Sequence, residues 1–156
     1  AMLVGGVAGG VTAGLFYQAS LWLRGNTPQG ASQSLRISTL QRQLQAIADR
    51  VDRSVPGRGP LAGTLKHTAF RQEVDALGWP GVRTEVSYLS RTEVPRGTPG
   101  SIRVDVVQEV FGRAGTRTVK AVYDLKTGAA ELTARRLAQI LEHLPADVPV
   151  IPIKPR

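Results

Sequence analysis

Cysteine is absent from the 156-residue sequence. Its absence excludes a disulfide scaffold, a thiolate zinc site and a cysteine nucleophile. Histidine occurs only twice, and the two residues fall in different predicted helices, so a metal site made of histidine side chains has little support. Any metal chemistry of this chain is therefore expected to depend on oxygen ligands.

Acidic residues are also few. Asp and Glu number 12 against 20 Lys and Arg, which gives a net charge of +8 and a pI near 10.8. Such a surplus attracts polyanions, so we expect nucleic acid as the first partner, an anionic membrane as the second and an acidic protein as the third. Hydrophobic residues make up 42% of the chain, which is enough for a folded core of one ordinary domain.

Charged side chains are missing from residues 1–23, and Arg24 ends this apolar, glycine-rich run. Gly6, Gly10 and Gly14 recur every fourth residue, a spacing that lines one helix face with small residues, as in helix contacts within membranes. We expect residues 1–24 to form an apolar helical segment. It would either make transient contact with a membrane through residues 1–23 or pack against protein.

Residues 25–60 are predicted to be a linker followed by a helix over residues 35–54. Four apolar residues of this helix repeat at helical spacing: Leu40, Leu44, Ile47 and Val51. The proline- and glycine-rich residues 56–60 then interrupt the chain. We expect the functional domain to begin after them and to span residues 61–156.

In residues 61–156 the pattern predicts the order α-β-β-β-α-β. Helices are expected over residues 66–77 and 130–144, and strands over residues 82–89, 102–111, 118–126 and 148–153. Residues 112–115 predict a hairpin between the second and third strands, and prolines place the last strand at a sheet edge. The predicted fold class is α/β, with a mixed sheet preceded by N-terminal helices.

The candidate chemistry lies in the sequence "AVYDLKTG", residues 121–128. Side chains alternate along a strand, so Asp124 and Lys126 point from the same face. Asp105 lies on the preceding strand, antiparallel through the hairpin, and the pairing register decides whether it meets Asp124. Two neighbouring carboxylates repel each other unless a cation lies between them. Mg²⁺, or Mn²⁺ in its place, is the hard cation expected here.

A third acid is expected from the preceding helix. Glu73 is the first candidate, with Asp75 and Glu85 as alternatives, and each is more often an ordinary surface residue when taken alone. Arg103 lies two residues before Asp105 and would face the same side, where its guanidinium can hold a phosphate. Lys126 would orient the nucleophile or stabilise developing negative charge.

This ordered set resembles the PD-(D/E)XK nuclease superfamily, which has a restriction-endonuclease-like fold. The resemblance covers about residues 63–153 and rests on Asp105, on Asp124-x-Lys126 and on a helix acid, Glu73. It implies that these four residues are catalytic, that the three acids bind the metal, and that DNA is the substrate. Gln139 and His143, four residues apart, are similar to a Gln-x-x-x-Tyr element of some members, with histidine in place of tyrosine, and this likeness implies that both contact nucleic acid.

A second resemblance concerns the organisation of the chain. An apolar segment, a helical linker and a small basic nuclease together resemble the C-terminal toxin regions of bacterial polymorphic toxins and secreted antibacterial effectors. This implies secretion from a producing bacterium, action in the cytoplasm of a target cell, and neutralisation by an acidic cognate immunity protein.

Several alternatives stay open at the level of sequence. Arg135 and Arg136 would contact nucleic acid on the predicted last helix, although exposed arginines equally serve solubility. His67, near a helix start, is most simply a surface residue, and His143 suits the negative end of its helix. A repair nuclease or an RNase of the same fold would have the same chemistry. In a membrane-associated, non-enzymatic domain, residues 1–23 and the basic surplus would matter most.

Overall fold

The computed structural model describes residues 28–156, and the surroundings of side chains from residue 39 onward. Internal contacts divide the chain into two units, Ala1–Thr39 and Leu40–Arg156. The predicted apolar segment, residues 1–24, lies outside the described residues. Among the helices that the structure describes, none is long and apolar enough to cross a membrane.

Helix α2 spans Pro28–Ser54, beginning before the predicted residue 35. Its apolar residues at helical spacing are all buried, which confirms the predicted inward face: Leu40, Leu44, Ile47 and Val51. The second unit begins at Leu40, upstream of the boundary expected near residue 60. Because these α2 residues belong to the same unit as the sheet, residues 55–59 are a turn between two helices of one unit.

Helix α3 spans Pro60–Ala76. Gly59 precedes it with a φ of 91°, which favours glycine, and Pro60 occupies the first helical position, where a missing N–H is harmless. The buried Lys66 donates to Asp52 of α2 at 2.7 Å and to the carbonyl of Gly57 at 3.4 Å. This partly buried ion pair connects α3 to the end of α2.

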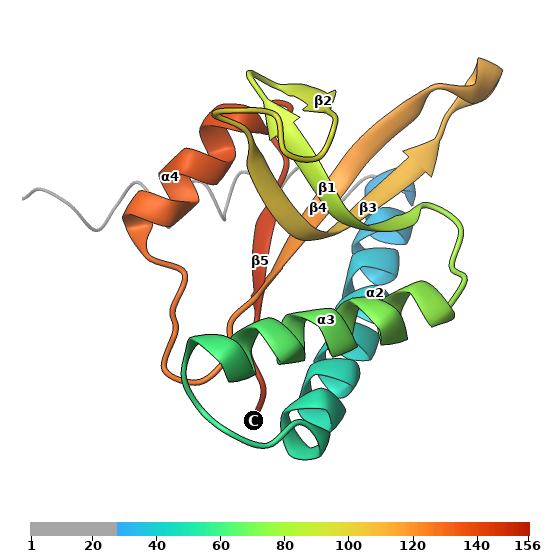
Figure 1. Ribbon diagram of the computed structural model, residues 1–156. Helices are drawn as coiled ribbons and strands as arrows, with labels where there is room; N and C mark the ends of the chain where they lie inside the picture. Colours follow the sequence, from blue (N-terminus) through green and yellow to red (C-terminus); the bar gives the residue numbers. More distant parts are fainter. Residues whose placement is uncertain (1–27) are drawn as a thin grey trace, which may run out of the picture. The chain divides into compact units, whose positions relative to one another are not determined.

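Five strands form one sheet in the order β2-β1-β3-β4-β5 (Figure 1). They are β1 Val82–Leu89, β2 Thr92–Val94, β3 Ile102–Phe111, β4 Arg117–Leu125 and β5 Val150–Ile153. The pairs β1–β2, β1–β3 and β3–β4 are antiparallel, whereas β5 is parallel to β4. The predicted α/β class with a mixed sheet is confirmed, and β5 lies at an edge, as its prolines predicted.

Helix α4, Ala134–His143, covers one side of the sheet, and Figure 1 shows α3 and the part of α2 from Leu40 onward on the other. The side chains between α4 and the strands form a hydrophobic cluster: Val86, Tyr88, Ile102, Val104, Val107, Val122, Ile140, Leu144 and Val148. The polar end of the sheet, where β3 begins and β4 ends, is thereby held between α3 and α4.

Besides the earlier start of α2, three observed elements differ clearly from the predicted ones. Helix α3 begins at Pro60, not at residue 66, because Pro60 suits the first helical position. Helix α4 begins at residue 134, not 130, because the Thr133 hydroxyl caps it by accepting from the Arg136 N–H at 3.2 Å. The three-residue strand β2 was not predicted. It has only Val94 as a partly buried apolar residue, too little for a strand signal in the sequence.

Candidate active site

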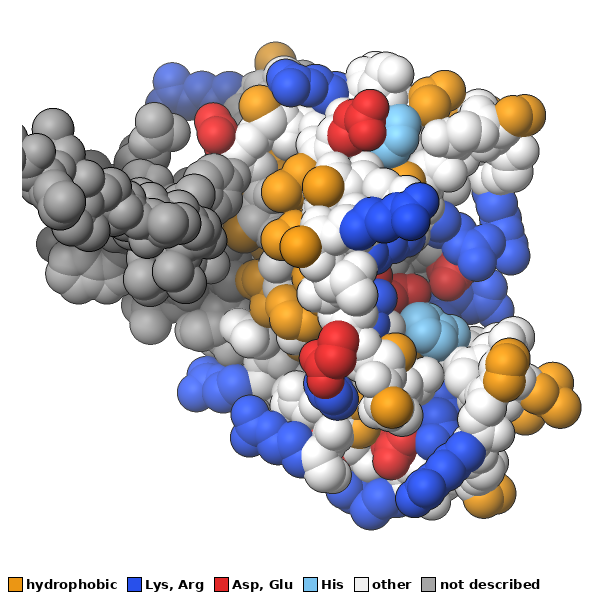
Figure 2. All heavy atoms as spheres, turned by 90° about the vertical axis from the view of Figure 1, so that its left-hand side faces the viewer, with side chains coloured by type: hydrophobic (Ala, Val, Ile, Leu, Met, Phe, Trp, Pro, Cys, Tyr) orange, Lys and Arg blue, Asp and Glu red, His pale blue; other side chains and the backbone are white. Residues whose placement is uncertain are grey.

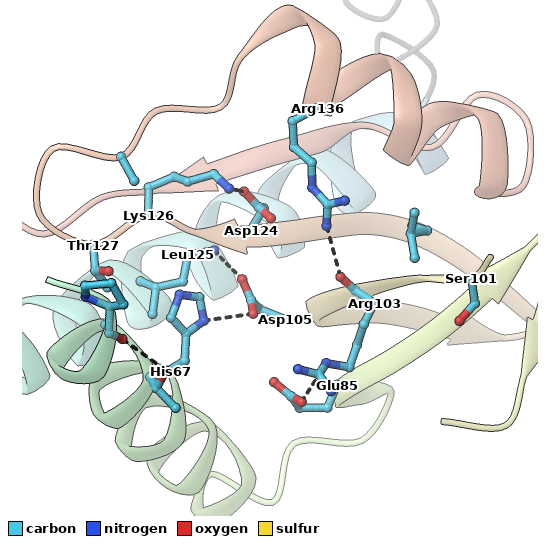
Figure 3. Close-up of a pocket in the computed structure, with 15 residues that line it drawn as sticks. His67, Glu85, Ser101, Arg103, Asp105, Asp124, Leu125, Lys126, Thr127 and Arg136 are labelled. Carbon is cyan, nitrogen blue, oxygen red and sulfur yellow. Dashed lines mark hydrogen bonds and ion pairs between the residues drawn. The ribbon is translucent and has the colours of Figure 1, made fainter. Parts of the chain in front are cut away.

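A pocket with a cavity volume of about 590 Å³ lies at the end of β4, beside the start of β3 and the first turns of α3 (Figure 3). Its polar lining includes three of the predicted site residues of the strands, namely Asp105, Asp124 and Lys126. The pocket therefore brings together, in three dimensions, the two carboxylates and the amine on which the sequence hypothesis depends.

Asp105 is fixed in the pocket by two hydrogen bonds. Its Oδ2 accepts from the backbone N–H of Leu125 at 2.6 Å, and its Oδ1 lies 3.1 Å from Nδ1 of His67. The β3–β4 register pairs Val106 with Tyr123, so one further step along both strands places Asp105 opposite Asp124. Each carboxylate oxygen can accept more than one bond, so both oxygens of Asp105 keep acceptor capacity toward the pocket.

Asp124 and Lys126 form an ion pair inside the pocket. Lys126 Nζ lies 2.5 Å from Oδ2 of Asp124, and the Asp124 side chain is only 6% exposed. The contact is not aligned as a hydrogen bond, and within the described residues this buried oxygen has no hydrogen-bond partner. The Lys126 backbone is anchored by its N–H, which donates to the carbonyl of Ile153 in β5 at 2.8 Å.

His67 is a pocket residue that the sequence analysis treated as an ordinary surface residue. It lies on α3, and the hydrogen bond to Asp105 raises the pKa of its imidazole, an effect that partial burial opposes and that Asp105, Asp124 and Glu85 reinforce by their charge. A signal existed in the sequence. Pro60, Gly63, Thr64 and His67 follow helical spacing and form the stripe of α3 that lines the pocket.

Two arginines contribute positive charge to the pocket. Arg103 of β3 forms an ion pair with Glu85 of β1, at 2.9 Å between Nε and Oε2. Arg136 reaches in from α4, where its Nη2 donates to the Arg103 carbonyl at 3.4 Å (Figure 3). Figure 2 shows, on the face of the molecule that carries α4, acidic side chains and a histidine in a recess surrounded by Lys and Arg side chains.

Glu73 does not lie in this pocket, contrary to its predicted role. It accepts hydrogen bonds from Arg50 of α2 at 2.6 and 3.2 Å. Glu73 lies six positions after His67 in the chain, which places it about 120° away around the helix. The alternative Asp75 also lies elsewhere and accepts from the Thr84 hydroxyl at 2.7 Å. Of the three acids considered, only Glu85 lines the pocket.

Three predicted nucleic-acid contacts on α4 are also absent from the residues that line the pocket: Arg135, Gln139 and His143. Arg135 and Gln139 are exposed. His143 instead joins the end of α4 to the turn between β1 and β2, where its Nδ1 accepts from the Ser90 N–H at 3.1 Å and its carbonyl from the Arg91 N–H at 2.9 Å. Its contacts are those of a structural residue.

The pocket offers carboxylate oxygens to a divalent cation, but from few side chains. Within the described residues, no group of three or more His, Cys, Asp or Glu side chains has the geometry to hold a metal. Mg²⁺, however, commonly uses one or two carboxylates and takes its other ligands from water and substrate phosphate. The two oxygen-donating acids Asp105 and Asp124 suit that pattern, although Oδ2 of Asp124 is ion-paired with Lys126. They are the residues that would hold the ion.

The chain was compared with protein-family models, with curated proteins and with solved structures, and none of the three comparisons finds a significant match.

Proposed function

We propose that this protein is a metal-dependent deoxyribonuclease with a restriction-endonuclease-like core. The observation that carries the proposal is the convergence of Asp105, Asp124 and Lys126 in one pocket. Structural domains gain nothing from two carboxylates and an ammonium gathered at a partly open pocket, whereas phosphodiester hydrolysis needs such a set. The +8 net charge adds attraction for a polyanionic substrate.

The arrangement of the sheet also supports the proposal. The predicted core order α-β-β-β-α-β corresponds to α3, β1, β3, β4, α4 and β5, with β2 as an added edge strand. The first three core strands are antiparallel neighbours, and β5 returns parallel to β4. The acid of β3 and the Asp-x-Lys pair of β4 stand on adjacent strands, as the resemblance to this nuclease superfamily requires.

The charged residues named above and His67 each have a role in the proposed hydrolysis. Asp105 and Asp124 would hold the divalent cation, which when bound polarises the phosphoryl group and lowers the pKa of a bound water. Lys126 orients the attacking water or stabilises negative charge that develops on the phosphoryl oxygens. Arg103 and Arg136 bind backbone phosphates and position the strand. His67 takes the place on α3 that the sequence assigned to Glu73 and keeps Asp105 in orientation.

A nuclease assay with matched variants tests this function. Purified protein is expected to degrade plasmid DNA with Mg²⁺ or Mn²⁺ and to spare it with EDTA. Asp124→Asn and Lys126→Ala are expected to remove cleavage, while Arg113→Gln, at the exposed tip of the β3–β4 hairpin, is expected to retain it. An Asp124→Asn protein that cuts as fast as the parent would disprove the site. RNA in a parallel reaction distinguishes a DNase from an RNase.

We further propose that the nuclease acts as an interbacterial toxin, delivered into the target-cell cytoplasm and neutralised by an acidic immunity protein. The proposal is supported by the organisation of the sequence and by its positive charge. Expression in a bacterial cytoplasm is expected to kill, and Asp124→Asn is expected to remove the toxicity. Growth of cells that produce soluble, active parent protein without any protective partner would contradict the toxin role and leave the nuclease role intact.

A further inference from the structure

Glu85 has an unusual backbone conformation for a residue within a strand. Its φ is +55°, in the left-handed region that non-glycine residues seldom adopt. The pairing of β1 with β3 is regular on both sides of Glu85, with Thr84 opposite Val106 and Val86 opposite Val104. Glu85 therefore lies opposite Asp105 in the sheet. Strained residues of this kind persist where their surroundings fix them, and they concentrate at functional sites.

The side chain of Glu85 is directed into the active-site pocket. It is 19% exposed, it lines the pocket, and its Oε2 lies 2.9 Å from Nε of Arg103 (Figure 3). The Arg103 side chain is 47% exposed, and within residues 39–156 Glu85 is the one acid that forms an ion pair with it. The end of the guanidinium fork is therefore left for a bidentate contact with a phosphate.

Two simpler roles do not account for Glu85. As a metal ligand it would have to give up its ion pair with Arg103, whereas Asp105 and Asp124 are already the one or two carboxylates that Mg²⁺ commonly uses. As a brace between β1 and β3 it would add little, because the strands are already hydrogen-bonded and an ion pair with a half-exposed arginine stabilises weakly. A strained acid inside a site for an anion needs another explanation.

We infer that Glu85 is a positioning residue, which holds Arg103 with Nη1 and Nη2 directed at a phosphate of the nucleic-acid strand. The inference rests on the proposed function, because it needs a phosphodiester substrate in the pocket. Arg136 also lines the pocket and contacts the backbone carbonyl of Arg103 at 3.4 Å, so it adds positive charge near the same phosphate. These contacts bind the backbone of the nucleic acid and read no sequence.

The direction in which Glu85→Gln changes DNA affinity distinguishes a positioning role from simple charge repulsion. Removing a negative charge from an anion site strengthens binding if the charge only repels the ligand. If Glu85 positions Arg103, Glu85→Gln weakens binding instead, because the freed guanidinium loses its orientation. The two possibilities therefore predict opposite changes in the dissociation constant.

The experiment is a double-mutant cycle measured by fluorescence anisotropy, with the full chain, EDTA and a labelled DNA duplex. Arg103→Gln is expected to weaken binding about tenfold, the effect of one charge-assisted contact. Glu85→Gln is expected to weaken it about threefold or more, and the double variant is expected to match Arg103→Gln alone. The logarithm of the association constant falls linearly with the logarithm of the salt concentration. In both single variants this slope is expected to be less steep, by up to about the amount that one phosphate contact contributes.

Three further variants separate positioning from a structural role. Glu85→Gly suits a positive φ, so it is expected to raise the melting temperature while still weakening DNA binding. Glu85→Asp keeps the charge and is expected to restore part of the affinity. Glu93→Gln removes the partner of Arg83, another glutamate–arginine pair of this sheet at 2.5 Å that lies outside the pocket, and is expected to leave DNA binding unchanged.

Equal or tighter binding by Glu85→Gln, or additive effects in the double variant, would overturn the inference. A parent protein that does not bind the duplex would overturn it as well. Cleavage assays with Mg²⁺ separate it from the proposed function. If the effects of Glu85→Gln and Arg103→Gln on DNA binding are non-additive but the parent does not cut DNA, only the proposed nuclease function is contradicted. If the parent cuts DNA but the two effects are additive, only the positioning role of Glu85 is contradicted.

Discussion

The backbone N–H of Leu125 donates a 2.6 Å hydrogen bond to Oδ2 of Asp105. Leu125 stands between Asp124 and Lys126, so this single bond ties the acid of β3 to the Asp-x-Lys segment of β4. It fixes the relative position of the two carboxylates even though they would repel each other. The stability of the site and its proposed chemistry therefore depend on the same atoms.

Substitutions of Asp105 are expected to separate stability from catalysis. Asp105→Asn keeps an oxygen acceptor for the Leu125 N–H and is expected to fold with nearly the stability of the parent, but to lose DNA cleavage. Asp105→Ala leaves that buried N–H without an acceptor, which costs about 1–3 kcal/mol. Denaturant unfolding and a plasmid assay measure the two effects. Equal stability of both variants would show that the hydrogen bond contributes nothing.

The Asp124–Lys126 pair is expected to be strongly coupled. Lys126→Met leaves a carboxylate that is 6% exposed without its cation and is expected to destabilise the protein by about 3 kcal/mol. Asp124→Asn in the same chain is expected to return most of that stability, yet cleavage stays lost in every variant. Additive destabilisation in the double variant, seen by chemical denaturation, would contradict the coupling.

His67 is expected to matter for cleavage through its contact with Asp105. His67→Ala removes the partner of Oδ1 and is expected to lower the rate about 10- to 100-fold, as loss of an orienting partner of a metal ligand does. His67→Asn retains a side chain that can hydrogen-bond at about the position of Nδ1 and is expected to recover part of the rate. Initial rates at saturating Mg²⁺ measure the effect, and unchanged rates in both variants would remove His67 from the site.

Glu73 is expected to be dispensable for cleavage, because its contacts are with Arg50 and not with the pocket. Glu73→Gln breaks a partly exposed ion pair and is expected to change stability by less than about 1 kcal/mol. Cleavage rates and the Mg²⁺ concentration for half-maximal activity are expected to equal those of the parent. A raised Mg²⁺ requirement would return Glu73 to the metal site and contradict the structure.

The Glu93–Arg83 pair predicts a pH dependence of stability. Hydrogen bonds from Arg83 lower the pKa of Glu93 below its ordinary value of 4.5, with burial opposing the shift and Arg117 adding to it. A lowered folded-state pKa stabilises the protein above about pH 4.5 and loses that effect as the pH falls through the folded value. The melting temperature of Glu93→Gln is therefore expected to lie below that of the parent near neutral pH and to converge with it in acid. A constant difference across that range would contradict the pairing.

The positions of the main strands could be predicted from the sequence. Alternating apolar residues predicted β1 and β3 with their observed bounds, and β4 within one residue at each end. The same alternation placed Asp124 and Lys126 on one face. Side chains in a strand repeat every two residues whatever the surrounding fold, so this part of the site was contained in local sequence.

The choice of residue from α3 was settled by tertiary structure. Helical periodicity offered several faces of α3 for the pocket, but the rotation of the helix is fixed by the burial of Lys66 and Phe70. That rotation turns the stripe ending at His67 toward Asp105. A single helix cannot specify which of its polar stripes will meet a distant strand.

The sequence by itself determined the α/β class, the order of the elements and the Asp-x-Lys arrangement, because strand and helix periodicity depend on residues near one another in the chain. The tertiary structure decided that Asp105 meets Asp124, that His67 and Glu85 line the pocket, and that Glu73 and His143 do not. Those outcomes depend on register and helix rotation, which are set by packing between segments far apart in the sequence.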